Sequence, residues 1–275
     1  MGNMLQNIMT KIRFRMSKLW CPESKRKVIH TQINGYELLV LANEDVGRQI
    51  HYRGYYEQAE TVYLRKKIRP DSICVDVGAN VGYFAMLMAQ TAHSGSVHAF
   101  EPIALNASLL KASAVLNGYF NIHINQCAVG DTEGEVSFSQ SADSAYSSML
   151  DTDRKPLQQV ITVPSLTLDG YLDQNQVPRV DILKADVEGA EGLVISGASG
   201  LLSDNKRRPD VILMELYDDN LKVFGSSVGL MVEKLQDFGY RPFVIDEQGE
   251  AIPFTDALKV NYYNVIFLPL VPYGQ

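Results

Sequence analysis

The sequence predicts an α/β fold: a doubly wound, mostly parallel seven-stranded sheet with a reversed edge strand, covered by helices on both faces. Three observations predict it. From residue 55 onward, short apolar segments alternate with helical patterns, which is the chain order of a parallel sheet. The first apolar segment, 72–77, runs directly into a glycine-containing loop and a helix. The last two, 240–245 and 261–268, have no helix between them, which predicts an antiparallel pair at one edge.

The predicted strands are mostly apolar runs that end at polar or glycine-containing turns. They lie at 72–77, 96–100, 121–126, 180–185, 210–215, 240–245 and 261–268. Helices are predicted at 55–68, 81–92, 103–117 and 227–238, with further helix starts near 165 and 189. Residues 134–164 interrupt this alternation and predict a small antiparallel insertion with a polar, serine-rich tip at 139–148.

Residues 1–54 predict an N-terminal extension, a helix and a β-hairpin, ahead of a main domain at 55–275. Asn34-Gly35 lies between two alternating runs and predicts a hairpin across 28–42. Residues 1–27 hold seven basic residues and one acid, with apolar residues at helical spacing. Such a basic amphipathic helix suits peripheral contact with an anionic membrane, or packing on its own domain or a dimer partner.

Composition excludes several classes of protein. The net charge of −7 argues against a nucleic acid as substrate. No apolar run approaches the ~20 residues that a membrane-spanning helix needs, and no signal peptide is predicted. The three cysteines are odd in number and widely spaced, which favours a reducing compartment and no zinc site. We expect a cytoplasmic protein, membrane-peripheral if residues 1–27 bind a membrane.

The loop after the first strand carries an acid that bears on the choice of cofactor. Asp76 stands two residues before Gly78, and the loop closes at Gly82. A pyrophosphate prefers backbone N–H groups without a neighbouring anion, whereas a carboxylate attracts the cationic S-adenosylmethionine (SAM). Glu101 ends the second strand and can accept hydrogen bonds from ribose hydroxyls, as such an acid also does for NAD. The loop therefore favours SAM, with an NAD-linked oxidoreductase or a ligand-free turn as alternatives.

Two further acids end strands at the same predicted edge of the sheet. Asp186 and Glu215 follow the fourth and fifth strands, and Lys184 shares a strand face with Asp186. Asp186, with Lys184 orienting it, is the predicted general base toward an acceptor hydroxyl, and Glu215 is a further catalytic candidate. A purely structural ion pair is the alternative. Asp186 and Glu215 also offer oxygen ligands for Mg²⁺. His51, in a polar aromatic segment suited to a lid, is a second candidate base.

At these motifs the chain resembles the FkbM family of SAM-dependent methyltransferases, which have the class I methyltransferase fold. The matching segments span residues 55–216: 76–84, 100–102, 128–131, 166–169, 184–191 and 209–215. The resemblance implies O-methylation of a small-molecule or glycan acceptor, such as a sugar, glycolipid, polyketide or related secondary metabolite. It implies that Glu57 lies near the methionine moiety of SAM. The matched motifs assign to the cofactor Asp76, Gly78, Ala79, Asn80, Gly82, Tyr83, Glu101, Pro102, Ala128 and Val129. The alternative is a non-catalytic scaffold protein with the SAM-binding fold, whose basic N-terminus would be its functional region.

Overall fold

The computed structural model describes residues 27–254 and 262–270. The amphipathic helix predicted within residues 1–27 lies, apart from Lys27, outside the described residues. Among the described residues, we find no helix with the length and apolar character that crossing a membrane requires.

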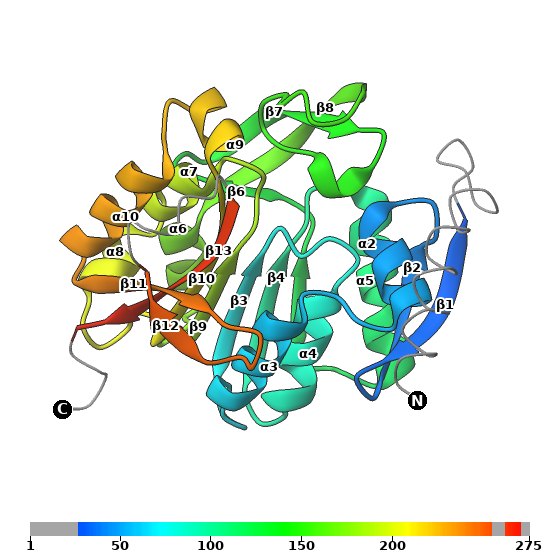
Figure 1. Cartoon of the computed structure of the whole chain (residues 1–275), viewed down its shortest axis with the longest axis horizontal. Helices are drawn as coiled ribbons and strands as arrows, with labels where there is room; N and C mark the ends of the chain where they lie inside the picture. The colour runs from blue at the N-terminus through cyan, green and yellow to red at the C-terminus, as the bar shows by residue number, and fades with distance from the viewer. Residues whose placement is uncertain (1–26, 255–261, 271–275) are drawn as a thin grey trace.

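The described residues form a central sheet of eight strands (Figure 1). Its strands, in spatial order, are β12 (Ala251–Pro253), β11 (Tyr240–Ile245), β13 (Tyr262–Pro269), β10 (Val211–Tyr217), β9 (Ile182–Ala185), β3 (Ile73–Val77), β4 (Ser96–Phe100) and β5 (Ile122–Asn125). The run from β10 to β5 is parallel, and β13 is antiparallel to both of its neighbours. All seven predicted strands are present, so the doubly wound, mostly parallel sheet is confirmed.

The reversed strand differs in position from the prediction. β13 lies between β10 and β11 rather than at the edge, and the short β12 adds an eighth strand outside β11. Val265, Ile266 and Phe267 in β13 are completely buried. An interior position with strands on both sides suits such a continuous apolar run better than an edge does.

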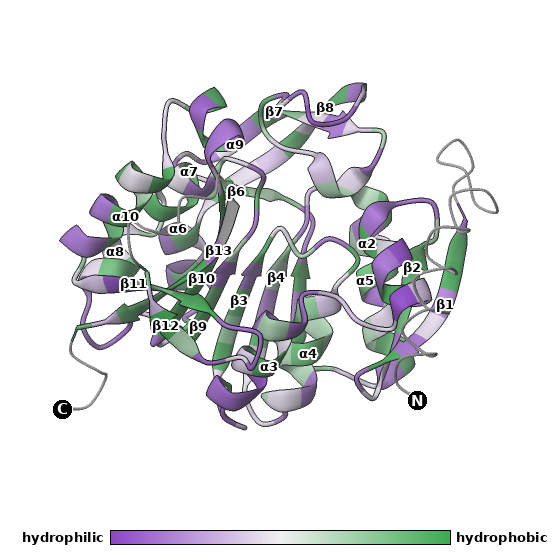
Figure 2. Ribbon diagram, in the orientation of Figure 1, coloured by the Kyte–Doolittle hydropathy of each residue, from purple (hydrophilic) through white to green (hydrophobic). Residues whose placement is uncertain are grey.

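Helices cover both faces of the sheet (Figure 1). One face carries α3 (Gln58–Lys67), α4 (Tyr83–Thr91) and α5 (Ala104–Asn117), and the other carries α6 (Leu168–Gln174), α7 (Glu191–Ser196), α8 (Ser199–Ser203) and α10 (Val228–Asp237). Neighbouring strand residues enter different cores: Cys74 packs with the first set of helices and Val75 with the second. α4 is built mostly of apolar residues (Figure 2), and seven of its nine residues are buried.

The N-terminal hairpin is confirmed and shares the core of the main domain. β1 (Val28–Ile33) and β2 (Tyr36–Leu41) pair antiparallel around Asn34-Gly35. β2 packs on α5, where the Asn117 side chain accepts from the Glu37 N–H at 2.8 Å and donates to the Glu37 carbonyl at 2.7 Å. Two short helices follow, α2 (Asp45–Arg48) and the π-helix η1 (Gln49–Arg53).

The predicted insertion forms a second, three-stranded sheet. It consists of β6 (Ala128–Gly130), β7 (Gly134–Ser141), the 3₁₀ turn η2 (Ser144–Tyr146) and β8 (Leu157–Thr167). β7 and β8 pair antiparallel, as predicted. The insertion lies at the carboxyl ends of the parallel strands, together with α9 (Asp218–Val223) (Figure 1). The Ser148 hydroxyl fixes it there by donating to the Val187 carbonyl at 2.8 Å.

Replacing Gly78 by alanine should destabilise the fold far more than the same change at Gly118. Both residues have left-handed φ angles, +78° and +66°, which cost a side-chain-bearing residue ~1–2 kcal/mol. A Cβ at Gly78 would also lie 1.9 Å from the backbone oxygen of Asp186, whereas one at Gly118 would meet no described residue within 4 Å. We expect Gly78→Ala to lower the free energy of unfolding by about 3 kcal/mol or more, measured by urea denaturation. Equal losses in the two variants would contradict this packing constraint.

Candidate active site

The turn after β3 is held by bonds to the neighbouring strand. The N–H groups of Gly78 and Ala79 both donate to the carbonyl of Phe100 at the end of β4, each at 3.0 Å. Asn80 has a left-handed φ of +49°, and its side-chain oxygen accepts from the N–H of Val81 at 2.7 Å. This side chain thus stabilises its own turn. The loop is therefore a fixed wall at the end of β3 and β4.

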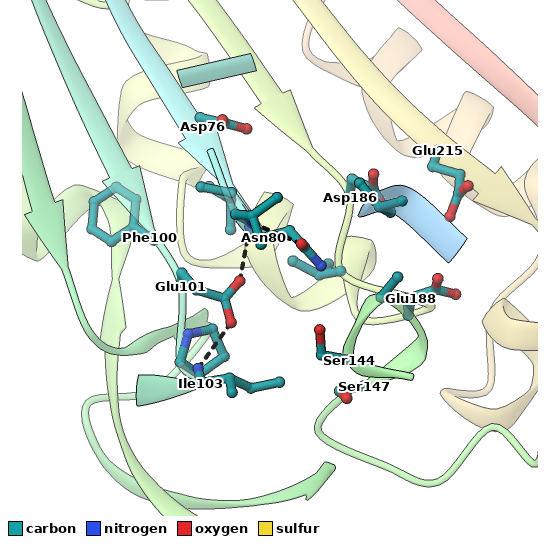
Figure 3. Close-up of a pocket in the computed structure, with 18 of the residues that line it drawn as sticks. Asp76, Asn80, Phe100, Glu101, Ile103, Ser144, Ser147, Asp186, Glu188 and Glu215 are labelled. Carbon is teal, nitrogen blue, oxygen red and sulfur yellow. Dashed lines mark hydrogen bonds between the residues drawn. The ribbon is translucent and has the colours of Figure 1, made fainter. Parts of the chain in front are cut away.

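A cavity of about 300 Å³ lies along the carboxyl ends of β4, β3, β9 and β10. Figure 3 shows Glu101 on one side of it and Asp186 and Glu215 on the opposite side. The N-terminal extension and the insertion contribute walls of their own, among them Asp45, Val46, Gln49, Phe138, Ser144, Tyr146, Ser147, Met149 and Arg154. Ligands of doubly wound folds bind at this edge of the sheet.

Glu101 is an almost fully buried acid with its two oxygens fixed. One oxygen accepts from the N–H of Asn80 and the other from the N–H of Ile103, each at 2.9 Å (Figure 3). Burial raises the pKa of Glu101 to about 7, although these hydrogen bonds oppose the shift. A carboxylate has about four acceptor positions. Glu101 therefore keeps acceptor capacity for a hydroxyl pair in the cavity.

Asp76 is completely buried, and within residues 27–254 and 262–270 neither of its oxygens has a hydrogen-bond partner. Burial raises its pKa to about 6, while the charge of Lys184 acts in the opposite direction. A buried acid without a partner is expensive. It fits a ligand that brings positive charge or hydrogen-bond donors, and SAM carries a sulfonium and an ammonium. The residues present therefore fit SAM.

Lys184 supplies a buried positive charge next to these acids. It pairs in register with Asp76 across β3 and β9, and its ammonium donates to Asp186 at 3.0 Å. It also lies 5.0 Å from the centre of the Phe84 ring. Burial alone would lower the pKa of Lys184, but the carboxylates of Asp186, Asp76 and Glu57 outweigh it and raise the pKa. Lys184 is therefore charged, and Asp186 is its partner.

Three acids meet beside this lysine. Carboxylate oxygens of Glu57, Asp186 and Glu215 all lie within 4.8 Å of one another. Glu57 has a left-handed φ of +38°, and burial raises its pKa to about 8. Carboxylate oxygens this close together could bind Mg²⁺, the metal predicted for Asp186 and Glu215. However, the ammonium of Lys184 already balances the negative charge of Asp186. The cluster therefore contains a positive charge that does not depend on a metal ion.

The cavity brings together nearly all the predicted site residues. The candidates Asp186, Lys184 and Glu215 line it, as do Glu57, Asp76, Gly78, Ala79, Asn80, Tyr83, Glu101, Pro102, Ala128 and Val129. Gly82 does not line it; a Cβ there would lie 2.1 Å from Leu110, so Gly82 permits close packing of α4 on α5. His51 does not line it either. It is exposed and packs edge-on against Tyr52, so the structure gives His51 no place as a base.

Sequence reasoning did not single out the cavity residues that the insertion contributes between 138 and 154, nor the contacts of Glu188. Arg154 donates to Glu188 at 2.5 Å, and Asn220 donates to the same oxygen at 2.5 Å. Glu191 lies in the first turn of α7, and its side chain accepts from the N–H groups of Val187 and Gly189 in the preceding loop. The available signal for Arg154 was an arginine within the insertion, a few residues after its serine-rich tip.

Comparison with known proteins agrees with this geometry. The family model of the methyltransferase FkbM domain matches residues 76–242. This chain belongs to the FkbM methyltransferase family. It is 27% identical over 243 residues to 31-O-demethyl-FK506 methyltransferase FkbM of Streptomyces tacrolimicus, covering 77% of this chain and 88% of that protein. It is 24% identical over 186 residues to hexuronic acid methyltransferase AglP of Haloferax volcanii, covering 64% and 71%.

Among solved structures, TYW2 of M. jannaschii in complex with AdoMet aligns with a TM-score of 0.41 and 13% identity over 88% of this chain and 85% of that chain. The family model begins at Asp76, where the glycine loop starts, and ends within β11. As an FkbM methyltransferase, the chain is SAM-dependent. NAD is thereby set aside as its cofactor.

Removing the charge of Asp76 should stabilise the ligand-free protein. The folded-state pKa of about 6 lies above the ordinary 3.8, so the folded state binds the proton more tightly. Wild-type stability should then fall as pH rises from about 4 through 6, at a cost of about 2–3 kcal/mol. Asp76→Asn should lack this component and exceed wild type in urea denaturation at pH 8, while binding SAM more weakly. An identical pH dependence in the two proteins would refute the assignment.

Proposed function

We propose that this chain is an O-methyltransferase that transfers the methyl group of SAM to a hydroxyl of a sugar, glycolipid, polyketide or related secondary metabolite. One observation carries the proposal. A single cavity holds Glu101, an acid suited to ribose hydroxyls, and the cluster of Asp186, Lys184 and Glu215, which is suited to an acceptor hydroxyl. We also propose residues 55–275 as the methyltransferase domain and 1–54 as its extension. Membrane contact or dimerisation through residues 1–27 stays a prediction.

The first half of the cavity suits the cofactor. Glu101 would accept hydrogen bonds from the ribose, and the fixed loop from Gly78 to Asn80 would form the adjoining wall. Ala128 and Val129, both buried, offer an apolar surface nearby. Asp76 would face the cationic part of the cofactor, which would compensate its buried charge.

The second half suits the acceptor. The carboxylate of Asp186 would accept a hydrogen bond from the hydroxyl of the methyl acceptor. It would then take the proton of that hydroxyl as the new O–C bond forms. Lys184 would hold Asp186 in place through their 3.0 Å contact. Glu215, within 4.8 Å, would take part in positioning the hydroxyl. The cavity walls would hold both reactants in line, which is the main contribution expected of a methyltransferase.

SAM, when bound, supplies a methyl group on a positively charged sulfur. Transfer to the acceptor oxygen would form the new O–C bond and break the S–C bond, and the electron pair of the S–C bond would stay on sulfur. Asp186 receives the hydroxyl proton, so charge and atoms balance without a further reactant. The protein's part is to orient the hydroxyl, exclude water and hold that proton at Asp186.

The names of two relatives support an oxygen or sugar acceptor. One acts on 31-O-demethyl-FK506 and the other on hexuronic acid, according to their descriptions. The lining itself agrees, because four carboxylates, Glu57, Asp186, Glu188 and Glu215, offer hydrogen-bond acceptors to a compound with several hydroxyls.

The role of Asp186 can be tested with methyl-labelled SAM and fractions of a cell extract. Asp186→Asn keeps the shape but cannot take a proton, so methyl transfer should fall ~10²–10⁴-fold. SAM affinity, measured by calorimetry, should change little. Asp173→Asn is the matched control, since Asp173 is an exposed acid paired with Arg207 and does not line the cavity. Unchanged turnover in Asp186→Asn with intact SAM binding would show that another group is the base.

The role of a metal can be tested on the same reaction. If the ammonium of Lys184 provides the cation that Asp186 needs, turnover should persist within about twofold after dialysis against EDTA. Adding Mg²⁺ back should have no effect. Loss of activity that only Mg²⁺ restores would instead support a metal held by Asp186, Glu215 and Glu57.

A further inference from the structure

A cationic side chain of the insertion reaches the acceptor side of the cavity. The guanidinium carbon of Arg154 lies 4.5 Å from the centre of the Tyr146 ring and 4.9 Å from that of Tyr217. Contacts of this kind attract the planar cation to the ring and restrict its orientation. Arg154 also lines the cavity, and its side chain is 25% exposed. The insertion therefore presents a guanidinium in a restricted orientation to this end of the cavity.

Only part of that guanidinium is engaged by the described chain. Its Nη1 donates to Oε2 of Glu188 at 2.5 Å, whereas Nε and Nη2 find no acceptor among residues 27–254 and 262–270. The same Glu188 oxygen accepts from Asn220, so Glu188 retains a donor if Arg154 turns toward a ligand. Arginine has five N–H donors and can serve two oxyanions at once. The remaining donors suit a carboxylate or phosphate, which guanidinium groups bind through paired hydrogen bonds.

Of the charged residues around the cavity, Arg154 is the one that could bind an oxyanion of the acceptor. Arg154 and Lys184 are the two cations among the described lining residues. Lys184 is buried and committed to Asp186 at 3.0 Å, so it cannot approach a ligand at the rim. Glu188 and Glu215 are the acids that act on Arg154. An oxyanion on the acceptor would therefore have to bind at Arg154, and the positive charge of bound SAM would further favour it.

We propose that Arg154 selects methyl acceptors that carry an oxyanion, a carboxylate or a phosphate, close to the hydroxyl that is methylated. This inference rests on the proposed O-methyl transfer and narrows its substrate class. Arg154 is then a specificity-determining residue, while the proton still passes to Asp186.

The charge of the labelled product tests the proposal. A cell extract of the source organism is separated by anion exchange at neutral pH, and the retained and unretained fractions are each incubated with the full-length protein and methyl-labelled SAM. We expect label in the retained fraction. Treating that fraction with alkaline phosphatase should abolish the acceptor if the oxyanion is a phosphate monoester. Converting carboxylates to amides should abolish it if the oxyanion is a carboxylate.

Two variants test whether Arg154 recognises the negative charge of the acceptor. With the retained acceptor, Arg154→Gln should raise KM at least tenfold with a smaller change in kcat, and Arg154→Lys should recover part of the loss. SAM affinity should be unchanged in both, which checks that they fold. Lys66→Gln is the matched control: Lys66 is an exposed cation paired with Glu250, and neither residue lines the cavity. It should keep the wild-type KM.

The outcomes separate this inference from the function on which it rests. Label confined to the unretained fraction, or an unchanged KM in Arg154→Gln, would overturn the selection of an oxyanion and leave O-methyl transfer standing. Absence of label from both fractions, with SAM binding intact, would overturn the proposed function and this inference with it.

Discussion

The ion pair between Lys184 and Asp186 is the interaction around which the cavity is organised. A buried lysine is costly because its ammonium loses water, and Lys184 lies on a central strand with only 4% of its surface exposed. The fold compensates by placing acids at neighbouring strand ends, with Asp76 in register beside it. Removing the lysine would leave those acids to repel one another. The parallel register of β3 and β9 and the charge balance of the cavity therefore depend on each other.

Chain segments distant in sequence complete the walls around that pair. Asp45 of the N-terminal extension accepts from Tyr146 of the insertion at 2.9 Å, and its N–H donates to Asp143 at 2.8 Å. Glu44 accepts from the N–H of Ser144 at 3.2 Å. The sheet alone would leave the strand ends open to water. These contacts, about a hundred residues apart in the chain, enclose the cavity, where electrostatic interactions are stronger than in water.

The sheet strands and the acids near their ends could be predicted from the sequence. The order of the last strands and the segments that cover the cavity could not. Apolar runs and turn residues are local signals, so β3 and Asp76 could be placed from the pattern alone. The interior position of β13 could not, since strand order depends on contacts between distant segments. The same limit explains Arg154, whose partners Glu188 and Tyr217 come from elements far along the chain. His51 lies exposed in the π-helix η1 and outside the cavity, and a sequence pattern does not show which way the side chains of such a short segment point.

Asp76 shows why this loop favours a cationic cofactor over a dinucleotide. Its carboxylate is fully buried and has no hydrogen-bond partner among the described residues, so its ionised form is stabilised mainly by charge. A pyrophosphate over the loop would add negative charge beside it and raise the cost further. A sulfonium or ammonium would instead compensate it and favour ionisation. If the cationic part of SAM lies beside Asp76, as proposed, binding would offset the destabilisation that this unpartnered acid causes in the ligand-free fold.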